Sequence, residues 1–124
     1  MANTVRLIIH AFTVLLISTS TAHSSPQEIK PMTGECLKTV AVQYGIHPDV
    51  LLALLLVEGG TVGKNSRSND NGSYDIGLFQ INTIHRPALA ALGVSETELR
   101  NDGCINAAVA SWHLRRVLTP EAVS

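Results

Sequence analysis

The segment from Val50 to Val57 constrains the chain most, because every residue in it is apolar. A helix that is apolar on all sides must be buried nearly all round. Pro48 suits the first turn of a helix and Asp49 suits the positive end of its dipole, so we predict that the helix begins there. Gly59-Gly60 follow and tolerate the positive φ that ends a helix. The sequence therefore predicts a buried helix that presents one carboxylate, Glu58, in its last turn.

The position of Glu58 has a chemical consequence. The negative end of the helix dipole and apolar neighbours both raise the pKa of a carboxyl group. A carboxylic acid that is protonated near neutral pH can donate a proton to the leaving oxygen of a glycoside. The simpler alternative is an exposed glutamate that only solubilises the helix end.

The residues after Glu58 favour the chemical interpretation. The segment 61–74 is a polar loop with a tight-turn signal at Asn71-Gly72. It leads into Asp75-Ile-Gly-Leu-Phe-Gln80-Ile-Asn82, which adds a second carboxylate and two amides. A polar loop that joins an acid to such groups is typical of one wall of a sugar-binding cleft.

These two segments, Leu-Leu-Leu-Val-Glu58-Gly-Gly and Asn-Gly-Ser-Tyr-Asp75-Ile-Gly-Leu-Phe-Gln80-Ile-Asn82, resemble the lysozyme-like superfamily. Within it they are most similar to the specialised lytic transglycosylases of bacterial conjugation, type IV secretion and pilus systems. The resemblance implies a mainly α, lysozyme-like domain of the goose or transglycosylase type, and we expect a small hairpin after Glu58. It implies that Glu58 is the catalytic residue and that Gly77, Gln80 and Asn82 contact substrate. We add Tyr74, at the end of the loop, as a further substrate-binding candidate.

The implied reaction is cleavage of the β-1,4 bond between N-acetylmuramic acid and N-acetylglucosamine in peptidoglycan, with a 1,6-anhydro product. Asp75 leaves a second reaction open. At roughly 5 to 5.5 Å from Glu58 it could act as the nucleophile of a lysozyme-type hydrolase. We favour a structural role, in which Asp75 accepts hydrogen bonds from the turn at Asn71-Gly72. An inactive glycan-binding or assembly module is a third interpretation.

Cys36 and Cys104 are the only cysteines, and in an exported protein an even number favours a disulfide. The bond would tie the first helix to the last, and similar cysteine elements in the resembling family support this pairing. A metal site that combines the cysteines with His47, His85 or His113 is disfavoured, because the spacings match no zinc pattern. We predict no metal and no cofactor, with the histidines at the surface or at helix ends.

Residues 1–24 read as a secretory signal peptide: Arg6 precedes the apolar run Leu7–Ile17, and Ser20 and Ala22 suit a cleavage site. The run is too short for a stable membrane span, although an uncleaved anchor is the alternative. Residues 25–124 then form one domain in the periplasm or outside the cell. A net charge of −1 without a long basic run argues against nucleic-acid binding. The partners implied by the resemblance are peptidoglycan strands and components of a secretion or pilus machinery.

Local signals predict the remaining helices. Thr33 is a cap for a first helix, Ser95-Glu-Thr-Glu98 has the capping-box pattern, and apolar residues at helical spacing predict a last helix after Gly103. The buried faces are expected to contain Leu37, Val40 and Ala41 in the first helix and Ile105, Ala108, Val109 and Trp112 in the last. The resembling family usually continues past this last helix with another cleft element, so we expect a domain that is short at its C-terminus.

Overall fold

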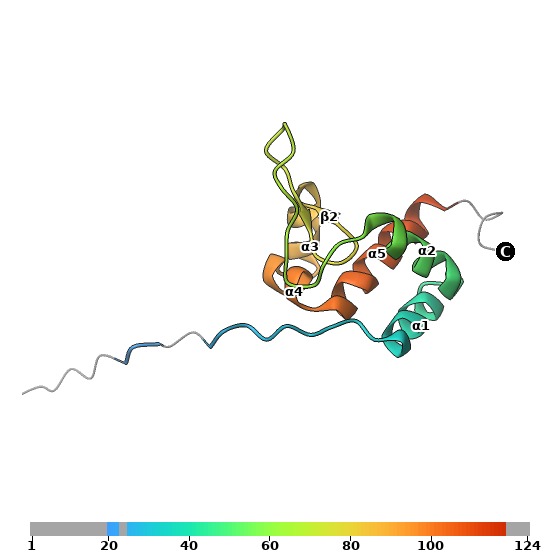
Figure 1. The fold of residues 1–124 in the computed structure, drawn as a ribbon, viewed down its shortest axis with the longest axis horizontal. Coiled ribbons are helices and arrows are strands. Elements are labelled where there is room, and N and C mark those ends of the chain that lie inside the picture. The colour runs from blue at the N-terminus through green and yellow to red at the C-terminus, as the bar shows by residue number, and fades with distance from the viewer. Residues whose placement is uncertain (1–19, 23–24, 119–124) are drawn as a thin grey trace, which may run out of the picture.

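The computed structural model of the protein describes residues 20–22 and 25–118. The predicted signal peptide, residues 1–24, falls outside the described residues except for 20–22. The described part is mainly helical, which confirms the predicted fold class (Figure 1). Its helices are α1 (Gly34–Gln43), α2 (Pro48–Glu58), the 3-10 helix η1 (Thr83–His85), α3 (Arg86–Ala91), α4 (Glu96–Asn101) and α5 (Gly103–Val117).

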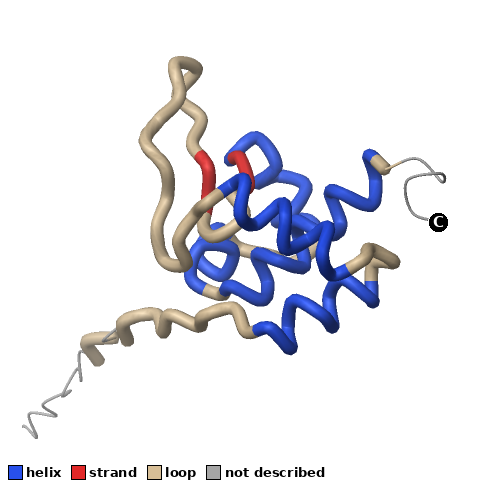
Figure 2. The backbone as a smooth tube through the Cα atoms, turned by 45° about the vertical axis from the view of Figure 1, so that its right-hand side comes forward, coloured by secondary structure: helices blue, strands red, loops and turns tan. Residues whose placement is uncertain are grey.

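A two-stranded hairpin follows the loop after α2. Strands β1 (Asp75–Ile76) and β2 (Ile81–Asn82) are antiparallel, with Asp75 opposite Asn82. The loop before β1 projects from the body of the domain, as Figures 1 and 2 show. At its tip Gly72 has a φ of 79°, and the backbone N–H of Ser73 donates to the side chain of Asn71. The turn predicted at Asn71-Gly72 and the small hairpin are therefore both present.

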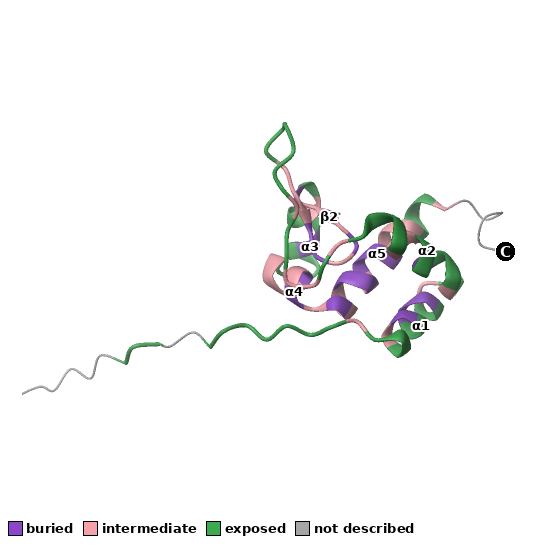
Figure 3. Ribbon diagram, in the orientation of Figure 1, coloured by how far each residue is buried: buried purple, intermediate pink, exposed green. Residues whose placement is uncertain are grey.

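Helix α5 is the centre of the core, and its buried residues lie between Gly103 and Ser111, whereas its last turns are not buried (Figure 3). It contacts both α1 and α4. Three of the buried side chains of α5 are small, Ala107, Ala110 and Ser111, and they let neighbouring helices approach closely. The buried face predicted for this helix was partly wrong, because Ile105, Ala108 and Trp112 are only half-buried. The apolar residues of the core are Leu37, Val40, Ala41, Ile46, Leu51, Ile76, Phe79, Ile81, Leu89, Leu99, Ala107, Val109 and Ala110.

Helix α2 is far more exposed than its sequence predicts. Only Leu51 is fully buried, while Leu56 and Val57 are 75% and 81% exposed. The prediction of a helix buried nearly all round is therefore wrong. At 100° per residue, Ala53, Leu56 and Val57 lie on the side away from Leu51, and in the described part of the chain that side is left exposed (Figure 3).

The ends of the helices follow their local signals. The hydroxyl of Thr33 accepts a hydrogen bond from the backbone N–H of Cys36 at 3.0 Å. Ser95 and Glu98 form the predicted capping box, in which each side chain accepts from the backbone N–H of the other residue. Helix α2 has a cap that was not predicted, because Nδ1 of His47 accepts from the N–H of Asp49 at 3.2 Å. These caps satisfy backbone donors that a helix leaves free in its first turn.

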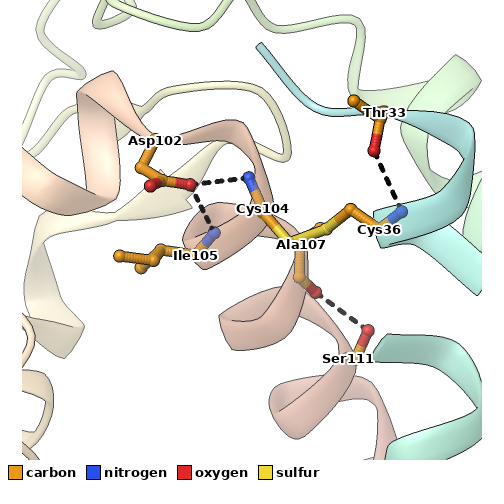
Figure 4. Close-up of a disulfide and its surroundings, with 7 residues drawn as sticks. All are labelled: Thr33, Cys36, Asp102, Cys104, Ile105, Ala107 and Ser111. Atoms are coloured by element: carbon orange, nitrogen blue, oxygen red, sulfur yellow. Dashed lines mark hydrogen bonds between the residues drawn. A yellow bond between two sulfur atoms is a disulfide. The ribbon is translucent and has the colours of Figure 1, made fainter. Parts of the chain in front are cut away.

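The predicted disulfide joins Cys36 of α1 to Cys104 of α5, with the two Cα atoms 5.9 Å apart (Figure 4). Beside it Asp102 caps α5 and accepts from the N–H groups of Cys104 and Ile105 (Figure 4). Lys30 extends the same junction, because its N–H donates to the carbonyl of Asn101 at 2.8 Å. The start of the domain is thus fixed against the first turn of α5.

Within the described ranges, no single helix has the length and hydropathy to cross a membrane. Helices α1 and α2 meet these two criteria only when taken together, and the pair is bent by 118°.

Candidate active site

A cavity of about 390 Å³ lies between the end of α2, the hairpin and the last turns of α5. We call it the Glu58 cavity. One carboxylate, two amides and two imidazoles line it, and its other lining residues are apolar. Its lining residues are Leu54, Glu58, Phe79, Gln80, Ile81, Asn82, His85, Ala110, His113, Leu114 and Val117.

A second cavity, of about 440 Å³, lies elsewhere on α5 and is mostly apolar. Its one carboxylate belongs to Glu98, which accepts from both the N–H and the hydroxyl of Ser95. These two hydrogen bonds lower the pKa of Glu98 and show that the carboxylate serves the capping box. The Glu58 cavity is therefore the better candidate for chemistry.

Glu58 is the last residue of α2 and is exposed. The prediction that apolar neighbours enclose it is therefore wrong. Helix α2 nevertheless determines which way the Glu58 side chain faces. Leu54 lies one turn earlier on the same side of the helix and lines the same cavity. Gly59 ends the helix with a φ of 60°, and its N–H donates to the carbonyl of Leu55 at 2.9 Å.

Gly60 explains how Glu58 and Gln80 reach one cavity. Its N–H donates to the carbonyl of Leu78 at 3.1 Å. A Cβ at this position would overlap the carbonyl oxygen of Gly77 and would lie 2.7 Å from Nε2 of Gln80. Only a residue without a side chain lets the end of α2 lie this close to the segment from Gly77 to Gln80.

Gln80 is the only non-glycine residue with positive φ in the described part of the chain, at 54°. Such conformations are uncommon for residues with a Cβ and concentrate at functional sites. One hydrogen of its amide Nε2 is used in a bond of 2.8 Å to the carbonyl of Gly77. The other hydrogen and the carbonyl oxygen of the side chain have no partner among the described residues, which leaves Gln80 able to bind a ligand.

Asn106 of α5 binds the backbone of the segment from Ile76 to Phe79, a role that the sequence did not predict. It is 1% exposed, and its Oδ1 accepts from the N–H of Phe79 at 2.7 Å. Its Nδ2 donates to the carbonyls of Ile76 at 3.0 Å and Leu99 at 2.8 Å. One side chain of α5 thereby connects strand β1, the backbone at Phe79 and helix α4. Asn106 lies in the first turns of the last predicted helix, and nothing in the sequence around it indicates that it binds distant segments.

Asn82 and Asp75 bind each other across the hairpin. Nδ2 of Asn82 donates to Oδ1 of Asp75 at 2.9 Å and to the hydroxyl of Ser73 at 3.2 Å, while its Oδ1 accepts from the N–H of Ile84. Both amide hydrogens of Asn82 are therefore used within the protein. Asp75 does not line the Glu58 cavity.

Two other predicted site residues lie outside the cavity. The hydroxyl of Tyr74 donates to Glu96 at 2.6 Å, and Arg86 donates to the other oxygen of Glu96 at 2.7 Å. The bond from Tyr74, together with the nearby arginine, lowers the pKa of Glu96, and the same bond raises the pKa of Tyr74. Gly77 is buried with a φ of 68°, and a Cβ there would lie 2.6 Å from Nδ2 of Asn106. The structure thus gives Tyr74 and Gly77 structural contacts and does not bring them to the cavity.

His85 and His113 line the cavity and were not predicted to do so. Their ring centroids are 4.2 Å apart, with the planes tilted by 52°. Burial of His113 lowers its pKa, and the nearby His85 and Arg116 lower it further. The spacing of Ala110, His113, Leu114 and Val117 on one face of α5 could have revealed this position. Among the described residues, no three His, Cys, Asp or Glu side chains are grouped as a metal ion would require.

A mainly helical domain whose catalytic candidate ends one helix, beside a short hairpin that carries Gln80 and Asn82, defines the lysozyme-like class. Residues 35–120 match the family described as Transglycosylase SLT domain, and the chain belongs to this family.

The chain is also similar to several known proteins. The chain is 32% identical over 81 residues to a peptidoglycan-binding-like protein of Escherichia coli O157:H7, a match that covers 60% of the chain and 48% of that protein. It is 32% identical over 76 residues to invasion protein IagB of Salmonella typhimurium, covering 61% of the chain and 48% of IagB. It is 32% identical over 73 residues to protein IpgF of Shigella flexneri, a match that covers 59% of the chain and 48% of IpgF. The chain thus spans about half the length of the relatives it matches.

Proposed function

We propose that this protein is a peptidoglycan lytic transglycosylase in which Glu58 is the catalytic acid and base. The observation that carries the proposal is that Glu58 and Gln80 line one cavity in a chain of the SLT family. The cavity is open to solvent at Glu58, which suits a polymeric substrate that must enter from the side. Its volume of about 390 Å³ is in the range of ligand-binding clefts.

The proposed reaction begins with protonation of the glycosidic oxygen by Glu58, which breaks the bond between that oxygen and C1 of N-acetylmuramic acid. The Glu58 carboxylate then accepts the proton of the C6 hydroxyl while that oxygen bonds to C1. The product is a 1,6-anhydro sugar, and no water is consumed. The free hydrogen and oxygen of the Gln80 amide are suited to bind an acetamido group or a hydroxyl of the sugar.

A hydrolase that uses Asp75 as nucleophile receives less support. The Asp75 carboxylate accepts the hydrogen bond of Asn82 and lies outside the Glu58 cavity. A nucleophile must reach the anomeric carbon beside the acid. The transglycosylase reaction needs no second carboxylate, so it fits the residues that line the cavity better.

We also propose that the protein acts outside the cytoplasm, where its glycan substrate lies. A disulfide such as Cys36–Cys104 is typical of exported proteins. The relatives include one named as peptidoglycan-binding-like and one named as an invasion protein. Local opening of the wall for a secretion, conjugation or pilus apparatus is the cellular role that we propose.

Digestion of purified peptidoglycan sacculi tests the proposal. We expect soluble muropeptides that end in 1,6-anhydro-N-acetylmuramic acid, identified by mass spectrometry as lacking one water relative to reducing-end products. Reducing ends in their place would identify a hydrolase. Binding to sacculi without any soluble product would identify a glycan-binding module.

A further inference from the structure

The Glu58 cavity contains basic groups that the proposed reaction does not use. Its ionisable side chains are Glu58 from α2, His85 from η1 and His113 from α5. The proposed reaction assigns a role to Glu58 alone and leaves the two imidazoles without one. The two histidines therefore call for a role in binding.

The two rings form a unit. His113 is half-buried between Trp112, whose ring centroid is 4.9 Å away, and His85 at 4.2 Å. Its Nε2 is sealed from solvent and has no hydrogen-bond partner among the described residues. A buried polar atom without a partner is costly and calls for an explanation. His113 supports the ring of His85, which is the imidazole in reach of a ligand.

We propose that the His85–His113 pair binds the lactyl carboxylate of N-acetylmuramic acid residues that carry no peptide, so that the enzyme prefers glycan strands stripped of their stem peptides. The proposal rests on the proposed function. When the stem peptide is present, the same lactyl group is an uncharged amide. Its removal creates one negative charge on each muramic residue.

The charges of the cavity support this assignment. A carboxylate that enters beside Glu58 is repelled unless a positive charge faces it. Among the residues that line the cavity, only the two histidines can supply one. The other charged groups near the pair are basic: Arg116 lies on α5 and influences His113, and Arg86 follows His85 but is paired with Glu96. Mutual repulsion between the rings favours one proton on the pair over two.

Calorimetric titration with two tetrasaccharides tests the proposal on the Glu58→Gln protein, because the wild type would cleave the muramic sugar during the titration. One is the alternating tetrasaccharide of N-acetylglucosamine and N-acetylmuramic acid with free lactyl groups, and the other is chitotetraose, which has none. We expect the muramic tetrasaccharide to bind about tenfold more tightly at pH 6. The preference should fall to about twofold at pH 8, because histidine side chains in general lose their positive charge between these two pH values.

Three substitutions, each added to Glu58→Gln, show which side chain causes the preference. His85→Gln should bring the ratio of the two affinities to about one at both pH values. His113→Phe keeps a ring against His85 but removes the second imidazole, and it should change how the ratio depends on pH. His47→Asn is the matched control, since it removes an exposed histidine outside the cavity and keeps a good helix cap.

Each outcome decides the question. Equal binding of the two sugars by Glu58→Gln, or a preference that survives when His85→Gln is added to it, would overturn the proposal and leave the transglycosylase function standing. Failure to bind either sugar, together with sacculi that the wild type leaves intact, would overturn both.

Discussion

Replacement of Asn106 by alanine is the sharpest structural test, because this one side chain supports the floor of the Glu58 cavity. It makes three hydrogen bonds, to the N–H of Phe79 and to the carbonyls of Ile76 and Leu99, and it is 1% exposed. Alanine would break all three bonds. It would also leave the buried N–H of Phe79 without its partner.

The magnitude follows from these bonds. Each contributes about 1 kcal/mol net, and an orphaned buried donor adds about 1 kcal/mol or more, which gives a loss of about 4 kcal/mol in the free energy of unfolding. A domain of this size has only about 5 to 15 kcal/mol in total. With a urea m value of about 1.5 kcal/mol/M, the midpoint should fall by about 2.7 M.

Urea unfolding followed by far-UV circular dichroism measures this shift, with the disulfide intact. Ser111→Ala is the matched control, because Ser111 is a buried polar residue of the same helix that makes one bond, from its hydroxyl to the carbonyl of Ala107 at 2.8 Å. Its loss should cost less than about 1 kcal/mol. Equal small shifts in the two variants would refute the role assigned to Asn106.

Three further predictions concern the surrounding structure. Gly60→Ala should destabilise the domain by several kcal/mol and abolish glycan cleavage, since a Cβ would lie 2.6 Å from the carbonyl oxygen of Leu78, whereas Gly34→Ala, with open space around it, should change the unfolding midpoint little. The pKa of Glu96 is lowered chiefly by the hydrogen bond from Tyr74, so its stabilisation is present above the unfolded-state pKa of about 4.3 and is lost as pH falls through the folded-state value. Tyr74→Phe should therefore lose less stability than the wild type between pH 6 and pH 3, and identical acid unfolding curves would contradict this. Reduction of the disulfide, which closes a loop of 68 positions, should lower the unfolding free energy by roughly 4 kcal/mol in matched melts with and without reductant, and an unchanged melting temperature would show that the bond contributes nothing.

Much of the fold was predictable because its signals are local. The cap at Thr33 and the capping box at Ser95 depend on residues within one turn of each other, and both were predicted from sequence. The turn at Asn71-Gly72 follows the same rule. Such features need no knowledge of the rest of the molecule.

The exposure of α2 was not predictable, for a physical reason. An apolar sequence says which side chains gain from burial, but it does not say whether another element covers them. Leu56 and Val57 are as apolar as Leu51, yet only Leu51 meets the core. The incorrect surroundings predicted for Glu58 follow from the same error.

The parts of the site that were missed depend on contacts between distant residues. Asn106 binds Phe79 and Ile76, which precede it by 27 and 30 positions. Asn82 was predicted as a sugar ligand, but its hydrogen bond to Asp75 is fixed by the register of a hairpin whose strands have two residues each. Only the folded chain shows which polar groups remain free for a ligand.

Exchange of Glu58 for glutamine tests the central claim most directly, because it keeps the size of the side chain and removes the group that transfers protons. Glu35→Gln is the matched control, since Glu35 is an exposed glutamate in the first turn of α1. The measurement is the rate at which soluble 1,6-anhydro muropeptides are released from sacculi. The account predicts a loss of at least a hundredfold for Glu58→Gln and an unchanged rate for Glu35→Gln. A Glu58→Gln protein that cleaves at the wild-type rate would contradict it.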